Sequence, residues 1–157
     1  MKKKLLFVCL GNICRSPSAE AIMNKYLKMN YLNEEFICDS AGTAGYHIGE
    51  EADSRMKQYA LRRNYQLTSI ARQFNPEKDF DEFDYIIGMD EQNVRDIKKL
   101  ALNSIHIKKI SSMTDYCIRF LDYNSVPDPY YGGAEGVELV IDILEDACEG
   151  IINHISK

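Results

Sequence analysis

The residues best suited to chemistry lie near the N-terminus, in the segment Cys9-Leu10-Gly11-Asn12-Ile13-Cys14-Arg15-Ser16. Five residues separate Cys9 from Arg15, and the hydroxyl of Ser16 follows at once. A cysteine attacks phosphorus as a thiolate, which a helix N-terminus and a neighbouring guanidinium both favour. Such a loop can also turn successive backbone N–H groups toward an anion, and arginine offers a fork for phosphoryl oxygens. The spacing predicts a nucleophile inside an oxyanion-binding loop.

The elements that must position this loop are a strand before it and a helix after it. Residues 5–9 form a continuous apolar run, which is typical of a parallel strand buried on both faces, and the run stops at Gly11 and Asn12. Ser16 is a candidate N-cap, and Pro17 suits the first position of a helix. The loop is therefore expected at the carboxyl end of a strand, where open α/β sheets bind ligands.

Each of these residues also has a purely structural interpretation. A cysteine that closes a hydrophobic strand is often a small buried side chain, and an arginine before a helix is often a surface charge. The joint occurrence of Cys9, Arg15 and Ser16 at this spacing favours the chemical interpretation. The segment is not a nucleotide-binding P-loop, because it lacks the Gly-Lys-Ser/Thr ending.

The alternation of strands and helices continues along the chain. The pattern predicts strands over 36–41, 85–89 and 104–110, and helices over 53–63, after a cap at Asp90, and over 137–155. The segment 111–125 fits either a short helix or a packed loop. This order predicts one α/β domain over residues 1–157, a four-stranded parallel sheet with helices on both faces and the phosphate-binding loop after the first strand.

The composition of the chain disfavours two classes of partner, nucleic acids and anionic membranes. The net charge of -5 and the pI near 5.2 disfavour binding to nucleic acid or to an anionic membrane surface. The five cysteines form an odd number without metal-finger spacing, in a chain of 157 residues that is long enough to fold without disulfides. We therefore expect a reducing, cytoplasmic location, and no segment has the length of a membrane span.

The chain resembles the low-molecular-weight protein tyrosine phosphatases. The cysteine, the five intervening residues, the arginine and the serine of that family match Cys9 to Ser16, and Pro17 matches as well. The resemblance covers nearly the whole chain and includes Cys38-Asp39-Ser40-Ala41-Gly42-Thr43, Ala71-Arg72-Gln73, Phe83-Asp84-Tyr85-Ile86, Met89-Asp90 and Asp128-Pro129-Tyr130-Tyr131-Gly132.

The resemblance implies a covalent mechanism. Cys9 would be the nucleophile that forms a phosphocysteine, and Asp128 would protonate the leaving phenolate and later take a proton from water. Arg15 would clamp the phosphoryl oxygens together with the loop residues Leu10, Gly11, Asn12, Ile13, Cys14 and Ser16. No metal and no organic cofactor are expected.

The resemblance also assigns supporting roles. Ser16 would donate a hydrogen bond to the sulfur of Cys9, in addition to capping the helix. Asn12, in a left-handed conformation, would brace the loop partly through Ser40. Several relatives carry a histidine where this chain has Ser69, so Ser69 is the candidate to replace that histidine's hydrogen bond.

Three tyrosines and a second cysteine complete the expected site. By resemblance, Tyr130 and Tyr131 after the acid and Tyr46 on the opposite rim would wall the cleft, although exposed tyrosines are often packing residues. An aromatic wall suits a phenyl phosphate better than the shorter phosphoserine. Cys14 would form a reversible disulfide with Cys9, and the alternative is a thiol that only packs the loop.

The expected substrate is a phosphotyrosine protein or a small aryl phosphate, with inorganic phosphate as the product. A monomer is expected, with weak dimers through the active-site face. A thiol-coupled arsenate reductase on the same scaffold is the main alternative, and Cys117 and Cys148 would then have to relay electrons. A non-catalytic phosphotyrosine-binding module is a further alternative.

Overall fold

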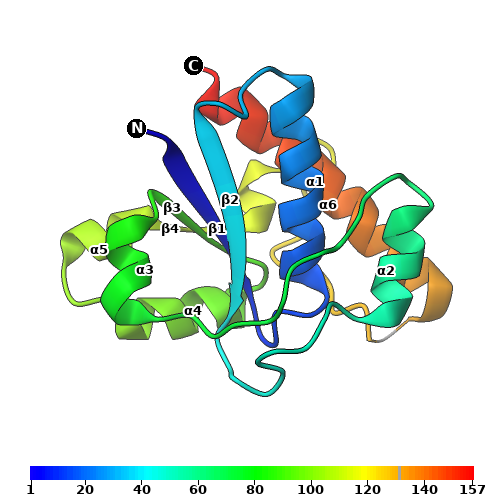
Figure 1. Ribbon diagram of the computed structural model, residues 1–157, viewed down its shortest axis with the longest axis horizontal. Coiled ribbons are helices and arrows are strands. Elements are labelled where there is room, and N and C mark those ends of the chain that lie inside the picture. Colours follow the sequence, from blue (N-terminus) through cyan, green and yellow to red (C-terminus); the bar gives the residue numbers. More distant parts are fainter. Residues whose placement is uncertain (131) are drawn as a thin grey trace.

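Four parallel strands in the order β2-β1-β3-β4 form the centre of the molecule, and helices cover both faces (Figure 1). The computed structural model describes residues 1–130 and 132–157. In chain order the elements are β1 (Lys3–Cys9), α1 (Arg15–Met29), β2 (Phe36–Gly42), α2 (Ser54–Leu61), α3 (Pro76–Glu82), β3 (Tyr85–Gly88), α4 (Glu91–Leu100), α5 (Ser104–Lys109), β4 (Ile110–Ser112), the 3-10 helix η1 (Met113–Tyr116) and α6 (Gly133–Ile155). The predicted fold class is confirmed.

Strand β1 is buried on both faces, as its continuous apolar run predicts. Leu5 and Phe7 face the cluster packed under α1 and α6, whereas Leu6 and Val8 face the cluster packed under α3 and α4. All four side chains are fully buried. Since burying a side chain of this size stabilises a fold by about 1.5–3 kcal/mol, β1 is a firm base for the residue that ends it, Cys9.

The order of the strands makes the end of β1 a natural ligand site. β1 pairs with β2 on one side and with β3 on the other, in both cases in parallel. The strands that follow β1 in the chain therefore lie on opposite sides of it. Such a switch in direction leaves a crevice at the carboxyl ends of the strands. The loop after Cys9 lies at this crevice.

Two helices differ from the predictions. Residues Ser104–Lys109, predicted as a strand, form α5, and the fourth strand follows at Ile110–Ser112. The side chain of Asn103 accepts a hydrogen bond from the backbone N–H of His106 at 2.9 Å and caps the helix. The ring of His106 also stacks on Phe80 of α3, with 4.3 Å between centroids. The helix α3 itself was not predicted, although Asn75 before Pro76 is a helix-start signal.

The last helix, α6, supplies much of one core cluster, and Cys148 lies within it with no exposed surface. Its buried Asp146 accepts hydrogen bonds from the backbone N–H groups of Ile118, Arg119 and Phe120 at 2.9–3.2 Å. A little further on, the N–H of Val126 bonds to the carbonyl of Met89 at 2.8 Å. The irregular segment 117–126 is thus attached at both ends. No helix in the described part of the chain is long and apolar enough to cross a membrane.

Candidate active site

The sulfur of Cys9 is held by two polar groups of the loop that follows β1. Ser16 Oγ lies 3.0 Å from the sulfur, and the backbone N–H of Asn12 donates to it at 3.3 Å. Ser16 Oγ itself accepts a hydrogen bond from Asn12 Nδ2 at 2.8 Å, and its own proton can face the sulfur at 3.0 Å or the more distant carbonyl of Ala41 at 3.5 Å. The backbone N–H of Asn12 and the hydroxyl of Ser16 therefore both lie against the sulfur of Cys9, which is 3% exposed.

The same loop offers a cradle of backbone N–H groups. Its carbonyl groups at Cys9, Leu10 and Ile13 are engaged, since they accept hydrogen bonds from Thr43, Ala44 and Asp53 at 2.8–2.9 Å. The N–H groups of residues 11, 13, 14, 15 and 16, by contrast, donate to no described residue. Carbonyls that face the protein and N–H groups without a protein acceptor are the pattern of an anion-binding nest at a helix N-terminus.

Asn12 fixes the shape of this loop. Its φ of 59° lies in the left-handed region, and its side chain is 1% exposed. Besides Ser16, its amide nitrogen donates to Ser40 Oγ at 2.9 Å, and its amide oxygen accepts from the backbone N–H of Arg72 at 3.0 Å. Asn12 therefore ties the loop to β2 and to the segment after Ser69.

The brace continues to a residue that sequence reasoning missed, Glu20. Ser40 Oγ donates to Glu20 Oε1 at 2.6 Å, so a hydrogen-bonded chain runs from Glu20 through Ser40 and Asn12 to Ser16. Burial raises the pKa of Glu20 to about 6. The signal in the sequence was that Glu20 lies four residues after Ser16, on the same face of α1.

Ser69 does not take part in this brace. Its hydroxyl is buried and has no hydrogen-bond partner among the described residues. The prediction that Ser69 replaces a family histidine's hydrogen bond is therefore wrong. The backbone N–H of Arg72 bonds to Asn12 instead.

Arg15 begins α1, with only 8% of its side chain exposed. Its NH1 atom donates to Asp90 Oδ2 at 2.8 Å and to the carbonyl of Val126 at 3.0 Å. Its other guanidinium nitrogens, Nε and NH2, have no hydrogen-bond partner among the residues that the structure describes. The partly buried ion pair with Asp90 thus fixes one edge of the guanidinium, and the other edge stays available to an anion.

The start of α1 corrects one expectation. The helix begins at Arg15, preceded by Cys14, and no side chain caps it, so the prediction that Ser16 is the N-cap and Pro17 the first helical residue is wrong. The hydroxyl of Ser16 faces the sulfur instead, and the hydroxyl of Ser18 donates to the carbonyl of Cys14 at 2.7 Å. The first-turn N–H groups consequently have no side-chain partner, which suits them to an anion.

Three distant segments converge on one pocket of about 130 Å³. It is lined by Cys9, Leu10, Gly11, Ile13, Cys14 and Arg15 from the loop and by Tyr46, His47, Asp128 and Tyr130 from two other segments. Tyr46 and Tyr130 are 77% and 79% exposed and form its rim. Tyr131, the third predicted wall residue, lies outside the described residues.

Asp128 lies at the mouth of this pocket in an exposed position. Its Oδ1 accepts a hydrogen bond from the backbone N–H of Tyr130 at 2.9 Å, the geometry of an Asx turn. Pro127 and Pro129 flank it and restrict the backbone on both sides. The carboxylate is therefore oriented by its own loop, with Oδ2 left open to a ligand as far as the described residues show.

Two further residues at the site were not predicted. His47 packs against the loop so closely that a Cβ on Gly11 would lie 2.8 Å from its ring, which explains the glycine at that position. Asp90 was expected only as a helix cap. It does cap α4 through the N–H of Asn93 at 2.7 Å, and it also pairs with Arg15. Neither role of these side chains has a spacing signal, because the contacts join residues far apart in the sequence.

The remaining cysteines differ from Cys9 in their surroundings. Burial, with the charges of Asp53 and Cys9 next, raises the pKa of Cys14 to about 12, so Cys14 is a thiol at neutral pH. Cys117 and Cys148 are both in the core, 9% and 0% exposed. A relay of electrons through Cys117 and Cys148 would need thiols that can exchange disulfides and that a reductant can reach, so their burial disfavours the arsenate reductase alternative.

Comparison with known families gives a match over almost the whole chain. The family model described as low molecular weight phosphotyrosine protein phosphatase matches residues 4–157. A putative low molecular weight protein-tyrosine-phosphatase from Synechocystis is 49% identical over 154 residues, which cover 98% of this chain and 97% of that protein. The low molecular weight phosphotyrosine protein phosphatase of Homo sapiens is 36% identical over 152 residues, covering 96% and 94%.

Solved structures agree with the sequence comparisons. A protein tyrosine phosphatase from Entamoeba histolytica, crystallised with Hepes in its active site, superposes with a TM-score of 0.94. It is 49% identical in sequence, and the match covers 99% of this chain and 97% of that one.

Proposed function

Because the chain belongs to the low molecular weight phosphotyrosine protein phosphatase family, we propose that it hydrolyses phosphotyrosine and aryl phosphate monoesters through a phosphocysteine. Members of this family are protein tyrosine phosphatases and therefore hydrolases. One observation supports the mechanism most strongly: the sulfur of Cys9 lies among hydrogen-bond donors in a pocket that also holds Arg15 and Asp128.

In the first step, the thiolate of Cys9 attacks phosphorus and forms the S–P bond while the P–O bond to the phenol breaks. Asp128 gives its proton to the departing phenolate oxygen. The unpartnered N–H groups of the loop and the open edge of Arg15 bind the three equatorial oxygens. Because these donors are already in place before the substrate arrives, they stabilise the charge of the transition state without reorganisation.

In the second step, water attacks the phosphorus of the phosphocysteine and the S–P bond breaks. Asp128, now a carboxylate, takes a proton from that water, and inorganic phosphate leaves. The hydroxyl of Ser16, 3.0 Å from the sulfur, donates to the departing thiolate and makes it a better leaving group. Asn12, Ser40 and Glu20 act as positioning residues, since they hold Ser16 and the loop but not the substrate.

The walls of the pocket support an aromatic substrate. Tyr46 and Tyr130 rise from opposite segments at the rim, so a phenyl ring would lie between two aromatic faces while its phosphate reaches Cys9. The proposal includes a monomer that can pair weakly through this rim, and a reducing, cytoplasmic setting in which the free cysteines persist. The disulfide between Cys9 and Cys14 stays a prediction.

The proposal is tested by hydrolysis of phenyl phosphate and of a phosphotyrosine peptide. The wild type should turn over both, and Cys9→Ser should lower kcat/KM at least about 10⁴-fold because the nucleophile is gone. Cys38→Ser is a matched control outside the loop and should keep nearly full turnover. Acid quenching during turnover of a ³²P-labelled substrate should trap label on the wild type and not on Cys9→Ser. Absence of wild-type turnover would refute the phosphatase proposal.

A further inference from the structure

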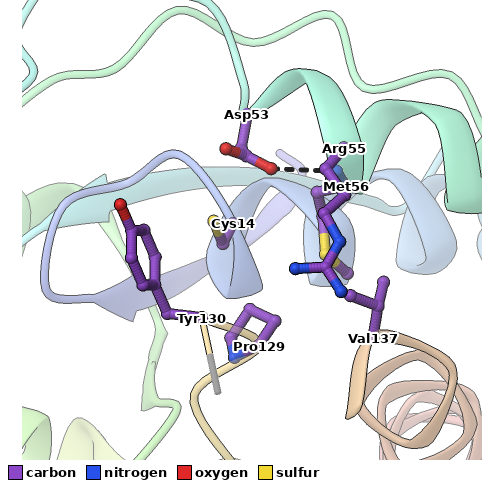
Figure 2. A pocket seen from close by; sticks show the side chains of 7 residues that line it. All are labelled: Cys14, Asp53, Arg55, Met56, Pro129, Tyr130 and Val137. Atoms are coloured by element: carbon purple, nitrogen blue, oxygen red, sulfur yellow. Dashed lines mark hydrogen bonds between the residues drawn. The ribbon is translucent and has the colours of Figure 1, made fainter. Parts of the chain in front are cut away.

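A second hollow lies directly beside the catalytic pocket. Its volume is about 250 Å³, and it shares two lining residues, Cys14 and Tyr130, with the pocket that holds Cys9 (Figure 2). The start of α2 forms one wall, and Pro129 from the preceding loop together with Val137 from the first turns of α6 forms another. A peptide whose phosphotyrosine enters the catalytic pocket would therefore pass this hollow with a neighbouring side chain.

The hollow contains the positive charge of Arg55, which pairs with no described residue of the protein. Arg55 is half-buried there, and Figure 2 shows its guanidinium directed into the space between Met56 and Val137. It makes no ion pair and no hydrogen bond with any described residue. The other six arginines each have a carboxylate or an aromatic ring as a partner: Arg15, Arg62, Arg63, Arg72, Arg95 and Arg119. A half-buried guanidinium without a partner next to a substrate pocket is suited to bind an anion.

The rest of the hollow limits which anion fits. Met56, Pro129 and Val137 provide apolar surface, so a ligand with methylene groups is favoured over a bare ion. The one carboxylate in the lining, Asp53, accepts the N–H of Met56 at 3.0 Å as the cap of α2. The partial positive charge of the α2 N-terminus lies beside this carboxylate and offsets part of its field, and no ion pair joins Asp53 to Arg55 among the described residues.

We propose that this hollow is a specificity subsite for a glutamate or aspartate side chain that flanks the phosphotyrosine of a protein substrate. The carboxylate pairs with Arg55, and its methylene stem packs on Met56, Pro129 and Val137. This inference rests on the proposed function, since it assigns the surroundings of the phosphotyrosine that the catalytic pocket accepts. Arg55 is a binding residue here and takes no part in the chemistry.

The test compares phosphotyrosine peptides that differ only by Glu or Gln at one flanking position, scanned over the three positions on each side. At one or two of these positions the wild type should prefer the Glu peptide by about 5- to 10-fold in kcat/KM, between the effect of an exposed ion pair and that of a fully buried charged hydrogen bond. Arg55→Met, which keeps the stem without the charge, should bring this ratio to about one. Arg55→Lys should retain part of it, and Arg95→Met, an exposed control on α4, should leave it unchanged.

The ratio of two peptides cancels any general change in turnover, so a partly impaired Arg55→Met still reports on the subsite. An equal preference in wild type and Arg55→Met, or no preference at any position, would overturn the subsite. Failure of the proposed function would look different, since phenyl phosphate would then not be hydrolysed. In that case the same Glu and Gln peptides, bound to Cys9→Ser and followed by fluorescence anisotropy, would still decide whether Arg55 selects an acidic neighbour.

Discussion

The two loops that meet at the pocket are built in opposite ways. In the loop after β1, Cys9, Asn12 and Arg15 are all at most 6% exposed. Hydrogen bonds join this loop to β2, to the cap residue of α4 and to the segment around Arg72. In the loop after Val126, Asp128 is exposed, and the hydrogen bond found for it among the described residues comes from its own loop. One half of the site is rigid by burial, and the other is oriented only locally.

The two loops differ in rigidity in the way that their proposed chemical tasks require. Groups that bind a developing charge are effective when they are fixed before the reaction, because they then need no reorganisation in the transition state. A general acid must meet a leaving oxygen whose position varies with the substrate, so a surface loop with some freedom is adequate. We therefore expect changes in the first loop to affect stability and turnover together, and changes in the second to affect turnover alone.

The largest effect is expected for a substitution of Asp128, in the exposed loop after Val126. Asp128→Asn removes the acid and should lower kcat by about 10²- to 10³-fold on phenyl phosphate, whose leaving group is poor. With a strongly acidic phenol as the leaving group, the loss should be much smaller, because that phenolate departs without a proton. The free energy of unfolding, measured by urea denaturation, should stay close to that of the wild type.

Asp122→Asn serves as the control for this change, since Asp122 is an exposed aspartate on the same stretch of chain outside the pocket. An Asp128→Asn enzyme as fast as the wild type on phenyl phosphate would remove Asp128 from the mechanism.

The next largest effect is expected for the buried brace, the hydrogen-bonded chain that runs from Glu20 through Ser40 and Asn12 to Ser16. Ser40→Ala deletes the hydroxyl that donates to Glu20 and accepts from Asn12, and a buried donor is then left without its acceptor. The free energy of unfolding should fall by about 1–3 kcal/mol. Because Asn12 also holds Ser16, kcat/KM for phenyl phosphate should fall roughly 10-fold as the loop loses its alignment.

Ser104→Ala, at an exposed position on α5, should change neither quantity and provides the reference. If Ser40→Ala loses stability but keeps full turnover, the brace supports the fold and not the alignment of the catalytic loop.

The smallest effect is a pH dependence. Burial raises the pKa of Glu20 from its ordinary 4.5 to about 6, so the folded chain holds this proton more tightly than the unfolded chain. The resulting stabilisation is complete below pH 4.5 and is lost as the pH rises through 6, and it amounts to about 2 kcal/mol at most. Glu20→Gln is neutral at every pH, so it should gain stability relative to the wild type between pH 4.5 and 7.

Urea unfolding of both proteins across this range measures the difference directly and cancels the other titrating groups. A constant difference between wild type and Glu20→Gln from pH 4 to 8 would contradict the raised pKa of Glu20.

Local patterns were enough to predict the strand, loop and helix around Cys9, the cap at Asp90 and the last helix. They failed at Ser104–Lys109, where Ile105 and Ile107 alternate with polar residues as in a half-buried strand. Both isoleucines are in fact exposed, at 65% and 42%, and the cap from Asn103 favours the helix. An alternation of apolar and polar residues predicts a strand only where the apolar side chains are buried.

The missing parts of the site have a common cause. Glu20, His47 and the link from Arg15 to Asp90 act through contacts between residues that are distant in the sequence. Residue type and spacing describe a loop and its helix, but they do not say which side chain of β2 or α4 will lie beneath them. The register of β1 against β2 and β3 brings Ser40 and Asp90 beside this loop, and that register is a property of the whole sheet.

Because segment 117–126 is attached at both ends, the chain between the two attachments can tolerate insertions. Asp146 holds the N–H groups of residues 118–120, and the bond from Val126 to Met89 fixes the start of the acid loop. Insertions between these two anchors would extend the segment toward solvent, while the anchors would keep the path from Val126 to Asp128 unchanged. The two anchors therefore allow the surface between residues 120 and 126 to vary in length and sequence without moving Asp128, the proposed general acid.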